Sequence, residues 1–281
     1  MCKLLPASVF IVLFAAFQAA QGGSILVYST ARHATQYCYP KAWFDDDLPA
    51  VLDNNGHVVT VTDRLSDPEI TTDLLSGYDQ LWILSADTAL GGCFSAEEVD
   101  AVLDYSNSGK GILIAADHTY AEGGHYYASD ANQIAEHFGV SFEGLADHTP
   151  GEGGVEPVPL TTALHPLMAD VELITGFRSE ALMNVSGAVD VVGSYGGDNL
   201  IAVTTGSGCR IVFDASFSRL WDTEIYVGDD NPQYVANIAE WLEGSVAVPS
   251  LSEMGLASII LLLLVSGALG TSILYRRRCS C

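Results

Sequence analysis

The sequence is poor in basic residues. Its 281 residues include 11 lysines and arginines against 35 aspartates and glutamates, which gives a formal net charge of −24. Between residues 23 and 249, seven basic residues face 34 acidic ones, so that region carries a net charge near −27. Such a field repels phosphate backbones and anionic lipid headgroups. The composition therefore argues against nucleic acid as a partner, and it fits a protein kept soluble in saline surroundings or one that collects cations.

Several motifs of enzymes and metal sites are also missing. The sequence has no Gly-x-Ser-x-Gly elbow, which removes the usual serine-hydrolase interpretation. It has no His-x-x-x-His pair and no paired cysteine spacing of the kind that holds zinc. If this chain has catalytic or metal-binding residues, they must come together from distant parts of the sequence.

The first 22 residues have the pattern of a signal peptide. Lys3 precedes the apolar run 4–17, and the small residues Ala20 and Gly22 suit cleavage after Gly22, with cleavage after Ala20 as the alternative. We therefore expect export by the secretory pathway and location in the cell envelope or at the cell surface.

A second apolar run, residues 254–275, contains no charged residue. As a helix it spans roughly 33 Å, which is enough to cross a bilayer. Three arginines follow directly, and positive residues stay on the cytoplasmic side. We expect type I topology, with a linker and sorting motif at 245–253, a transmembrane helix at 254–275 and a cytoplasmic basic tail at 276–281.

The segment that leads into this run resembles the IPTL-CTERM sorting tails, relatives of the PEP-CTERM tails. The matching residues are Pro249, Leu251, Ser252, Glu253 and Gly255, and the departures are Val248, Ser250 and Met254. The resemblance covers about the last 34 residues. It implies an exosortase-like sorting enzyme as partner and removal of the tail after export. A permanent transmembrane anchor is the alternative.

Cysteine is scarce in the region between these two ends. Of six cysteines in the chain, three remain there: Cys38, Cys93 and Cys209. In an oxidising compartment three cysteines allow one disulfide and one spare thiol. Cys38 and Cys93 lie in loops after the first and third predicted strands, at the same edge of a parallel sheet. We therefore predict a Cys38–Cys93 disulfide and a buried, free Cys209.

Alternating strand and helix patterns predict an α/β domain over residues 23–244. Strand patterns cover 24–29, 57–63, 80–86 and 111–117, and helix patterns cover 44–54, 96–106 and 129–138. This order predicts a three-layer sandwich with a mostly parallel central sheet. Short β-type runs between 155 and 207 predict an antiparallel elaboration of the second half. A further central strand at 209–214 and a last helix at 231–243 complete the domain.

The order of motifs over residues 24–244 resembles the class I glutamine amidotransferase-like superfamily. The residues that carry the resemblance are Gly77–Leu84, Phe94–Glu98, Ser108–Ile114, His165–Leu167, Arg210–Asp214 and Asn237–Leu242. The family's nucleophile is a cysteine in a Gly-x-Cys-x-Gly turn after a central strand. The corresponding turn, 115–119, reads Ala-Ala-Asp-His-Thr, and the late His-x-Glu pair is missing. The resemblance thus implies a flavodoxin-like or amidotransferase-like fold without amidotransferase activity.

Polar residues follow the predicted strands, at the edge where open α/β sheets bind ligands. The candidate ligand-binding residues are Arg32, His33, His125, Arg219 and Trp221. Weaker catalytic candidates are Asp117, His118 and Asp214, which with His125 are also potential ligands of a divalent cation. The alternative for the strand-end aspartates is that they cap the following turns. No other cofactor is expected.

The sequence leaves two functions open. The first is a non-catalytic envelope or surface module that binds a ligand or partner, because the amidotransferase-like pattern lacks its nucleophile. The second is an extracytoplasmic hydrolase that acts on a glycan or small molecule through Asp117, His118 and Asp214.

Overall fold

A computed structural model describes most of the expected α/β domain. The described residues are 22–34, 38–87, 91–117, 119–120, 125–147, 155–159, 161–162, 164–177, 179–205, 208–222, 225–226 and 230–244. Residues 1–21 of the expected signal peptide, and the expected sorting motif, transmembrane helix and basic tail at 245–281, lie outside them. Within the described ranges, no helix is long and apolar enough to cross a membrane.

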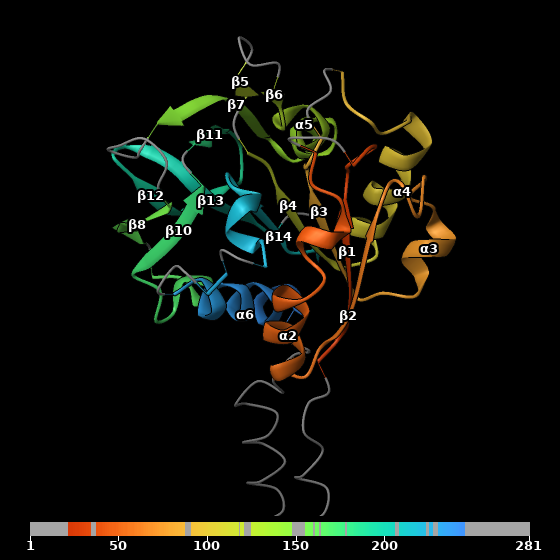
Figure 1. Ribbon diagram of the computed structural model, residues 1–281, viewed down its shortest axis with the longest axis horizontal. Helices are drawn as coiled ribbons and strands as arrows, with labels where there is room; N and C mark the ends of the chain where they lie inside the picture. Colours follow the sequence, from red (N-terminus) through yellow and green to blue (C-terminus); the bar gives the residue numbers. More distant parts are fainter. Residues whose placement is uncertain are drawn as a thin grey trace, which may run out of the picture. The chain divides into compact units, whose positions relative to one another are not determined.

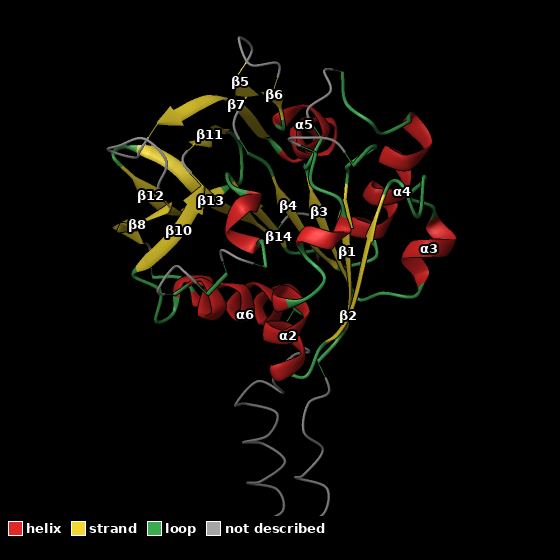
Figure 2. Ribbon diagram, in the orientation of Figure 1, coloured by secondary structure: helices red, strands yellow, loops and turns green. Residues whose placement is uncertain are grey.

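An eight-stranded sheet forms the centre of the molecule (Figures 1 and 2). Its strand order is β2-β1-β3-β4-β14-β13-β12-β9. The first five strands are parallel, and the last three join through antiparallel pairs. The bounds are β1 Ser24–Ser29, β2 Val58–Asp63, β3 Gln80–Leu84, β4 Gly111–Ala115, β9 Thr161–Thr162, β12 Asp190–Tyr195, β13 Asp198–Thr204 and β14 Ile211–Asp214. The predicted α/β class with a mostly parallel sheet is confirmed.

The central strands are buried on both faces. All five residues of β3 and of β4 are buried, as expected for apolar runs in the middle of a parallel sheet. Edge strand β2 instead alternates between more and less exposed residues over its first four positions. The core therefore lies along β1, β3, β4 and β14, with helices packed against it.

The α-helices divide into two groups. Their bounds are α2 Asp47–Asn54, α3 Thr72–Ser76, α4 Ala96–Asn107, α5 Ala128–Ala135 and α6 Asn231–Leu242. Helices α2 and α6 contact each other, whereas α4 contacts both α3 and α5, and the two groups lie on different sides of the sheet (Figure 1). A capping box between Ser95 and Glu98 starts α4, and the helix begins at residue 96 as predicted. Short 3-10 helices cover Lys41–Trp43, Glu136–Phe138, Pro166–Met168 and Phe217–Leu220.

The second half of the domain adds antiparallel ribbons. Strand β7 (Val140–Asp147) pairs with β11 (Ser179–Val185), and β8 (Val155–Pro159) pairs with β10 (Leu173–Phe177). A short ribbon joins β5 (Thr119–Tyr120) and β6 (His125–Tyr126). The predicted β-rich elaboration is confirmed, and it begins at Val140 rather than at 155 because β7 reaches forward to pair with β11.

Both ends of the described chain lie at the amino-terminal edge of the parallel strands. At the first end, the Ser24 backbone N–H donates to Asp79 Oδ2 at 2.9 Å, and Asp79 directly precedes β3. At the other end, Arg210, which precedes β14, donates from Nη1 to the Trp241 carbonyl at 2.7 Å. The carboxyl ends of β1, β3, β4 and β14 therefore point away from both ends.

Candidate functional site

The candidate site lies where the strand order reverses. From β1 the chain moves outward to β2, whereas from β3 it moves the other way to β4, and β1 and β3 are direct neighbours. Such a switch point leaves a crevice at the carboxyl ends of the two strands, and open α/β sheets bind ligands there. The loop after β1 carries Arg32 and His33, and the loop after β3 carries Asp87.

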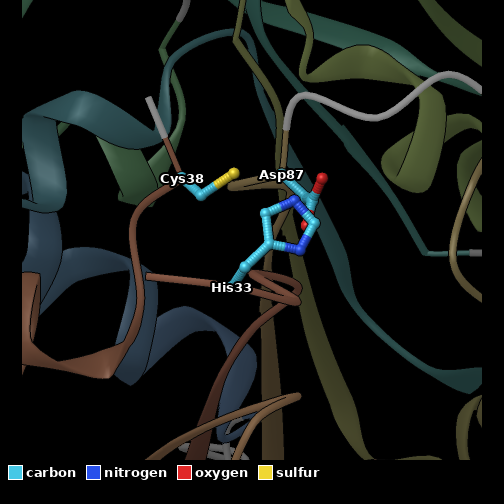
Figure 3. A group of neighbouring side chains, drawn as sticks. All are labelled: His33, Cys38 and Asp87. Carbon is cyan, nitrogen blue, oxygen red and sulfur yellow. The ribbon is translucent and has the colours of Figure 1, made fainter. Parts of the chain in front are cut away.

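Three chemically distinct side chains gather at this point: His33, Cys38 and Asp87, here named the switch-edge cluster. One ligand atom from each lies within 4.8 Å of the other two. Figure 3 shows the His33 imidazole beside the Asp87 carboxyl group, with the Cys38 thiol turned toward the same space. His33 is exposed, whereas Cys38 and Asp87 are buried. The cluster thus has a buried floor and one side open to solvent.

Arg32 fixes the position of Asp87. The Arg32 backbone N–H and Nε donate to Asp87 Oδ2 at 2.8 and 3.2 Å, and Nη2 donates to Oδ1 at 3.4 Å. The Asp87 side chain is fully buried, while that of Arg32 is 29 % exposed. Burial alone would lower the pKa of Arg32, but the hydrogen bond and charge of Asp87 raise it. Arg32 therefore stays charged and orients the carboxyl group within the cluster.

A second carboxyl group, that of Asp130, is buried nearby in the first turn of α5. Neither of its oxygens accepts a hydrogen bond of ordinary geometry from the described residues. Burial raises the pKa of Asp130 to about 6, although the Thr30 hydroxyl and the Arg32 charge oppose the change. Burial and the neighbouring Asp130 charge also raise the pKa of the Cys93 thiol. At neutral pH this buried region therefore holds a carboxylate beside a protonated thiol.

A group of aromatic rings packs around Tyr39, the residue that follows Cys38 in the sequence. The Tyr39 ring centroid lies 4.6 Å from that of Trp221 and 5.2 Å from that of Trp43. Trp221, a predicted ligand contact, is only 5 % exposed because these rings cover it. Trp43 is 41 % exposed and is the most exposed of these three rings, since Tyr39 is half-buried.

The neighbouring edge, after β4 and β14, is closed. Asp214 accepts from the Ser216 backbone N–H at 2.9 Å and from the Tyr234 hydroxyl at 2.8 Å. Arg219 Nη1 lies 3.2 Å from Asp214 Oδ1, and both side chains are fully buried. The catalytic candidate Asp214 and the ligand-binding candidate Arg219 thus form an internal ion pair, and the bond to Ser216 is the turn-capping role that the sequence left open.

Of the other residues predicted at that edge, the structure describes the side chain of Asp117 but not those of His118 and His125. Asp117 is 3 % exposed, and the Ser216 hydroxyl lies 3.5 Å from its Oδ2. His118 lies outside the described residues, as does the placement of the His125 side chain at the start of β6. The structure brings the predicted site residues together in two groups along the carboxyl edge of the sheet. Arg32 and His33 lie after β1, and Asp117, Asp214 and Arg219 lie at the ends of β4 and β14.

The structure corrects the disulfide prediction. Cys38, Cys93 and Cys209 are all thiols, so the Cys38–Cys93 bond is not formed. Cys38 lies beside His33 and Asp87, whereas the Cys93 thiol lies near the Asp130 carboxyl group, so the two sulfur atoms have different neighbours. Cys209 is buried, as predicted.

Asp87 and Asp130 are site residues that the sequence pattern does not single out. Asp87 does carry the same local signature as Asp117, since each follows a buried strand by two or three residues. Asp130 has no such signature, because it sits inside a helical pattern. For Cys38 the sequence predicts a disulfide, not a place in this cluster.

Comparison with known proteins identifies similar folds but no similar site. No protein-family model matches the sequence, and no curated protein matches it. The N-terminal domain of mmIFT52 is similar in structure at a TM-score of 0.59 and 14 % identity, covering 77 % of this chain and 100 % of that one. A cytoplasmic protein of Salmonella typhimurium LT2 (TM-score 0.54, 12 % identity) covers 78 % of this chain and 99 % of its own. A ThuA-like protein from Bacteroides uniformis (TM-score 0.51, 13 % identity) covers 80 % and 93 %. These likenesses show a shared mixed α/β fold with a mostly parallel sheet, consistent with the flavodoxin-like class.

Proposed function

We propose that this chain is an exported surface protein whose α/β domain, a degenerate amidotransferase-like domain, binds a ligand at the carboxyl edge of β1 and β3. The supporting observation is the switch-edge cluster, in which a buried floor of Cys38 and Asp87 meets an exposed His33 at the topological switch point. Polar groups that converge in a partly open crevice and include a perturbed carboxyl group are typical of binding sites.

The role is binding rather than amidotransferase catalysis. The turn after β4, where the family nucleophile would stand, carries Asp117, and that side chain is buried. The alternative is a hydrolase that acts through Asp117, His118 and Asp214. Asp214 does not suit this role, because it is held in a fully buried ion pair with Arg219. A carboxylate with no exposure and three internal partners has no access to a substrate.

A thermal-shift screen tests the binding role. The purified chain is screened against sugars, amino acids, polyamines and divalent metal ions, and each hit is repeated with His33→Ala and with His137→Ala. Both histidines are exposed, but His137 lies away from the cluster in the 3-10 helix after α5. We expect at least one stabilising ligand whose effect is lost in His33→Ala and kept in His137→Ala. A complete absence of hits, or hits insensitive to His33→Ala, contradicts the proposal.

The surface location rests on the two ends of the chain. We propose that a signal peptide over residues 1–22 directs export and that the tail with Pro249, Leu251, Ser252, Glu253 and Gly255 is removed by an exosortase-like enzyme. Mass spectrometry of the mature protein from the native host checks this, with protease accessibility on intact cells as the test of surface exposure. A mature chain that still carries Tyr275 and the following arginines would indicate a permanent anchor instead.

A further inference from the structure

The switch-edge cluster has the ligand set of a metal site. We infer that His33, Cys38 and Asp87 bind one divalent transition-metal ion of the zinc type. This inference rests on the proposed binding role of the same edge and names its ligand. The three residues share no local spacing motif, because they come from the loops after two neighbouring strands.

The geometry suits a small ion. In a tetrahedral zinc site the metal lies about 2.0–2.3 Å from each donor, which sets the donors roughly 3.5 Å apart. The donor atoms of His33, Cys38 and Asp87 lie within 4.8 Å of one another. The exposed His33 side chain is able to rotate and close the remaining distance, while buried Cys38 and Asp87 form the fixed part of the site. In Figure 3 all three groups point into the same space.

The donor types select the metal. A thiolate and an imidazole are favoured by zinc and cobalt, whereas calcium and magnesium take oxygen donors. Three protein donors leave one coordination position of a tetrahedral ion open, and His33 is on the solvent-exposed side. The site therefore has the composition of an open zinc site rather than of a closed structural one.

The charge around the cluster matches a doubly charged cation. The Cys38 thiolate, the Asp87 carboxylate and the neighbouring Asp130 carboxylate supply three negative charges, and Arg32 supplies one positive charge. The remaining two negative charges equal the charge of the ion. Without a metal, the buried Asp130 oxygens have no hydrogen-bond partner of ordinary geometry among the described residues, and a nearby cation would stabilise them.

The positive charge of Arg32 opposes binding of a metal cation. The contacts of Arg32 show how Asp87 can hold both the arginine and the ion. Its stronger contacts, from the backbone N–H and Nε, go to Asp87 Oδ2, while Oδ1 has the longer 3.4 Å contact with Nη2. An ion bound through Oδ1 would leave Arg32 on Oδ2. Arg32 would then orient the metal-binding carboxylate from outside, as hydrogen-bonded partners of metal ligands commonly do. On binding, Cys38 releases its thiol proton to solvent as the sulfur–metal bond forms.

Cobalt spectroscopy tests the site. The full chain is used in a background with Cys2, Cys279 and Cys281 replaced by serine, so that Cys38, Cys93 and Cys209 are the remaining thiols. The metal-free protein is titrated with Co²⁺ under reducing conditions. We expect one ion per chain, a thiolate-to-cobalt charge-transfer band in the near ultraviolet and visible bands of a four-coordinate ion. Addition of Zn²⁺ should remove these bands by displacement.

Matched variants assign the ligands. Cys38→Ser should abolish the charge-transfer band, whereas Cys209→Ser, at the opposite edge of the sheet, should leave it unchanged. His33→Ala should weaken Co²⁺ binding at least about tenfold, and His137→Ala should not. Circular dichroism establishes that each variant is folded. If Cys38→Ser does not fold, the exposed His33→Ala variant decides alone.

Several outcomes would overturn the inference. They are the absence of a charge-transfer band at saturating Co²⁺, a band that survives Cys38→Ser or disappears in Cys93→Ser, and unchanged affinity in His33→Ala. If Co²⁺ does not bind, but stabilisation by an organic ligand in the thermal-shift screen still depends on His33, the proposed binding role stands without the metal. If neither metal binding nor stabilisation by an organic ligand depends on His33, the metal inference and the proposed binding role are both wrong.

Discussion

The carboxyl edge of the sheet has two halves that use similar residues in opposite ways. After β1 and β3, Arg32 pairs with Asp87 beside an exposed histidine and a thiol, and the arginine is partly exposed. After β4 and β14, Arg219 pairs with Asp214, and neither side chain is exposed at all. An arginine–aspartate pair at a strand end therefore does not by itself mark a site. What distinguishes the first half is a side open to solvent, where an exposed histidine lies beside the pair.

The largest expected effect comes from breaking the closed half. Arg219→Ala leaves the Asp214 carboxylate fully buried without its cation, and we expect a loss of about 3–5 kcal/mol in the free energy of unfolding. Arg32→Ala is the matched comparison, with an expected loss of about 1–2 kcal/mol. The Arg32 backbone N–H still donates to Asp87 in this variant, and removal of the partly exposed Arg32 side chain lets solvent reach the carboxyl group. Urea unfolding in the presence of a chelator measures both. Equal losses would remove the distinction between the two halves.

A smaller effect should follow from Asp130. Its folded-state pKa of about 6 lies above the ordinary value of 3.8. Between these values the folded state keeps a proton that the unfolded state has released, so this group makes stability fall as the pH rises from 4 to 6. Asp130→Asn should remove that fall and stabilise the chain at pH 7 by at most about 3 kcal/mol. Unfolding free energies measured between pH 4 and pH 8 check this.

The control for this pH series is Asp100→Asn, on the exposed face of α4. It should keep the pH dependence of the parent chain. If the unfolding free energies of the parent chain and of Asp130→Asn changed with pH in the same way, Asp130 would not be a buried carboxylate. The region after β1 and β3 would then contain no unsatisfied carboxylate at Asp130.

The smallest expected effect on stability belongs to His33. Because the side chain is exposed, His33→Ala should change the unfolding free energy of the metal-free chain by no more than about 0.5 kcal/mol. His57→Ala, at a position only 2 % exposed, should cost at least about 1 kcal/mol. Thermal and urea unfolding measure the pair. A large destabilisation by His33→Ala would indicate a structural role for the residue and weaken its assignment to a ligand.

Much of the fold is readable from local sequence. The run Ser24–Ser29 is apolar and central, and the predicted and observed bounds of β1 agree. Helix α4 was predictable because its capping box marks the start. Helix α3 was not predicted, since its five residues are too few for a helical repeat to show.

The site is less readable because its contacts are long-range. His33 could be predicted, since it follows a strand directly, and strand ends are where such sheets bind ligands. Its neighbour Asp87 could not be predicted, because Asp87 comes close to His33 only through the pairing of β1 with β3. Asp130 could not be predicted either, because it comes close to Arg32 and Asp87 only through the packing of α5. Cysteine number suggested a disulfide for Cys38, but the position of its sulfur beside His33 and Asp87 is a property of the folded chain.

The placement of the first and last described segments of the domain has a practical consequence for handling it. Residues 24 and 241 are both held at the amino-terminal edge of the parallel strands, opposite the switch-edge cluster. In a domain trimmed to residues 22–244, a tag, linker or solid support joined at either end is therefore attached on the far side of the domain from His33. Immobilisation through either end should leave the cluster accessible to solution, so surface-based binding measurements with tethered protein are well suited to this fold.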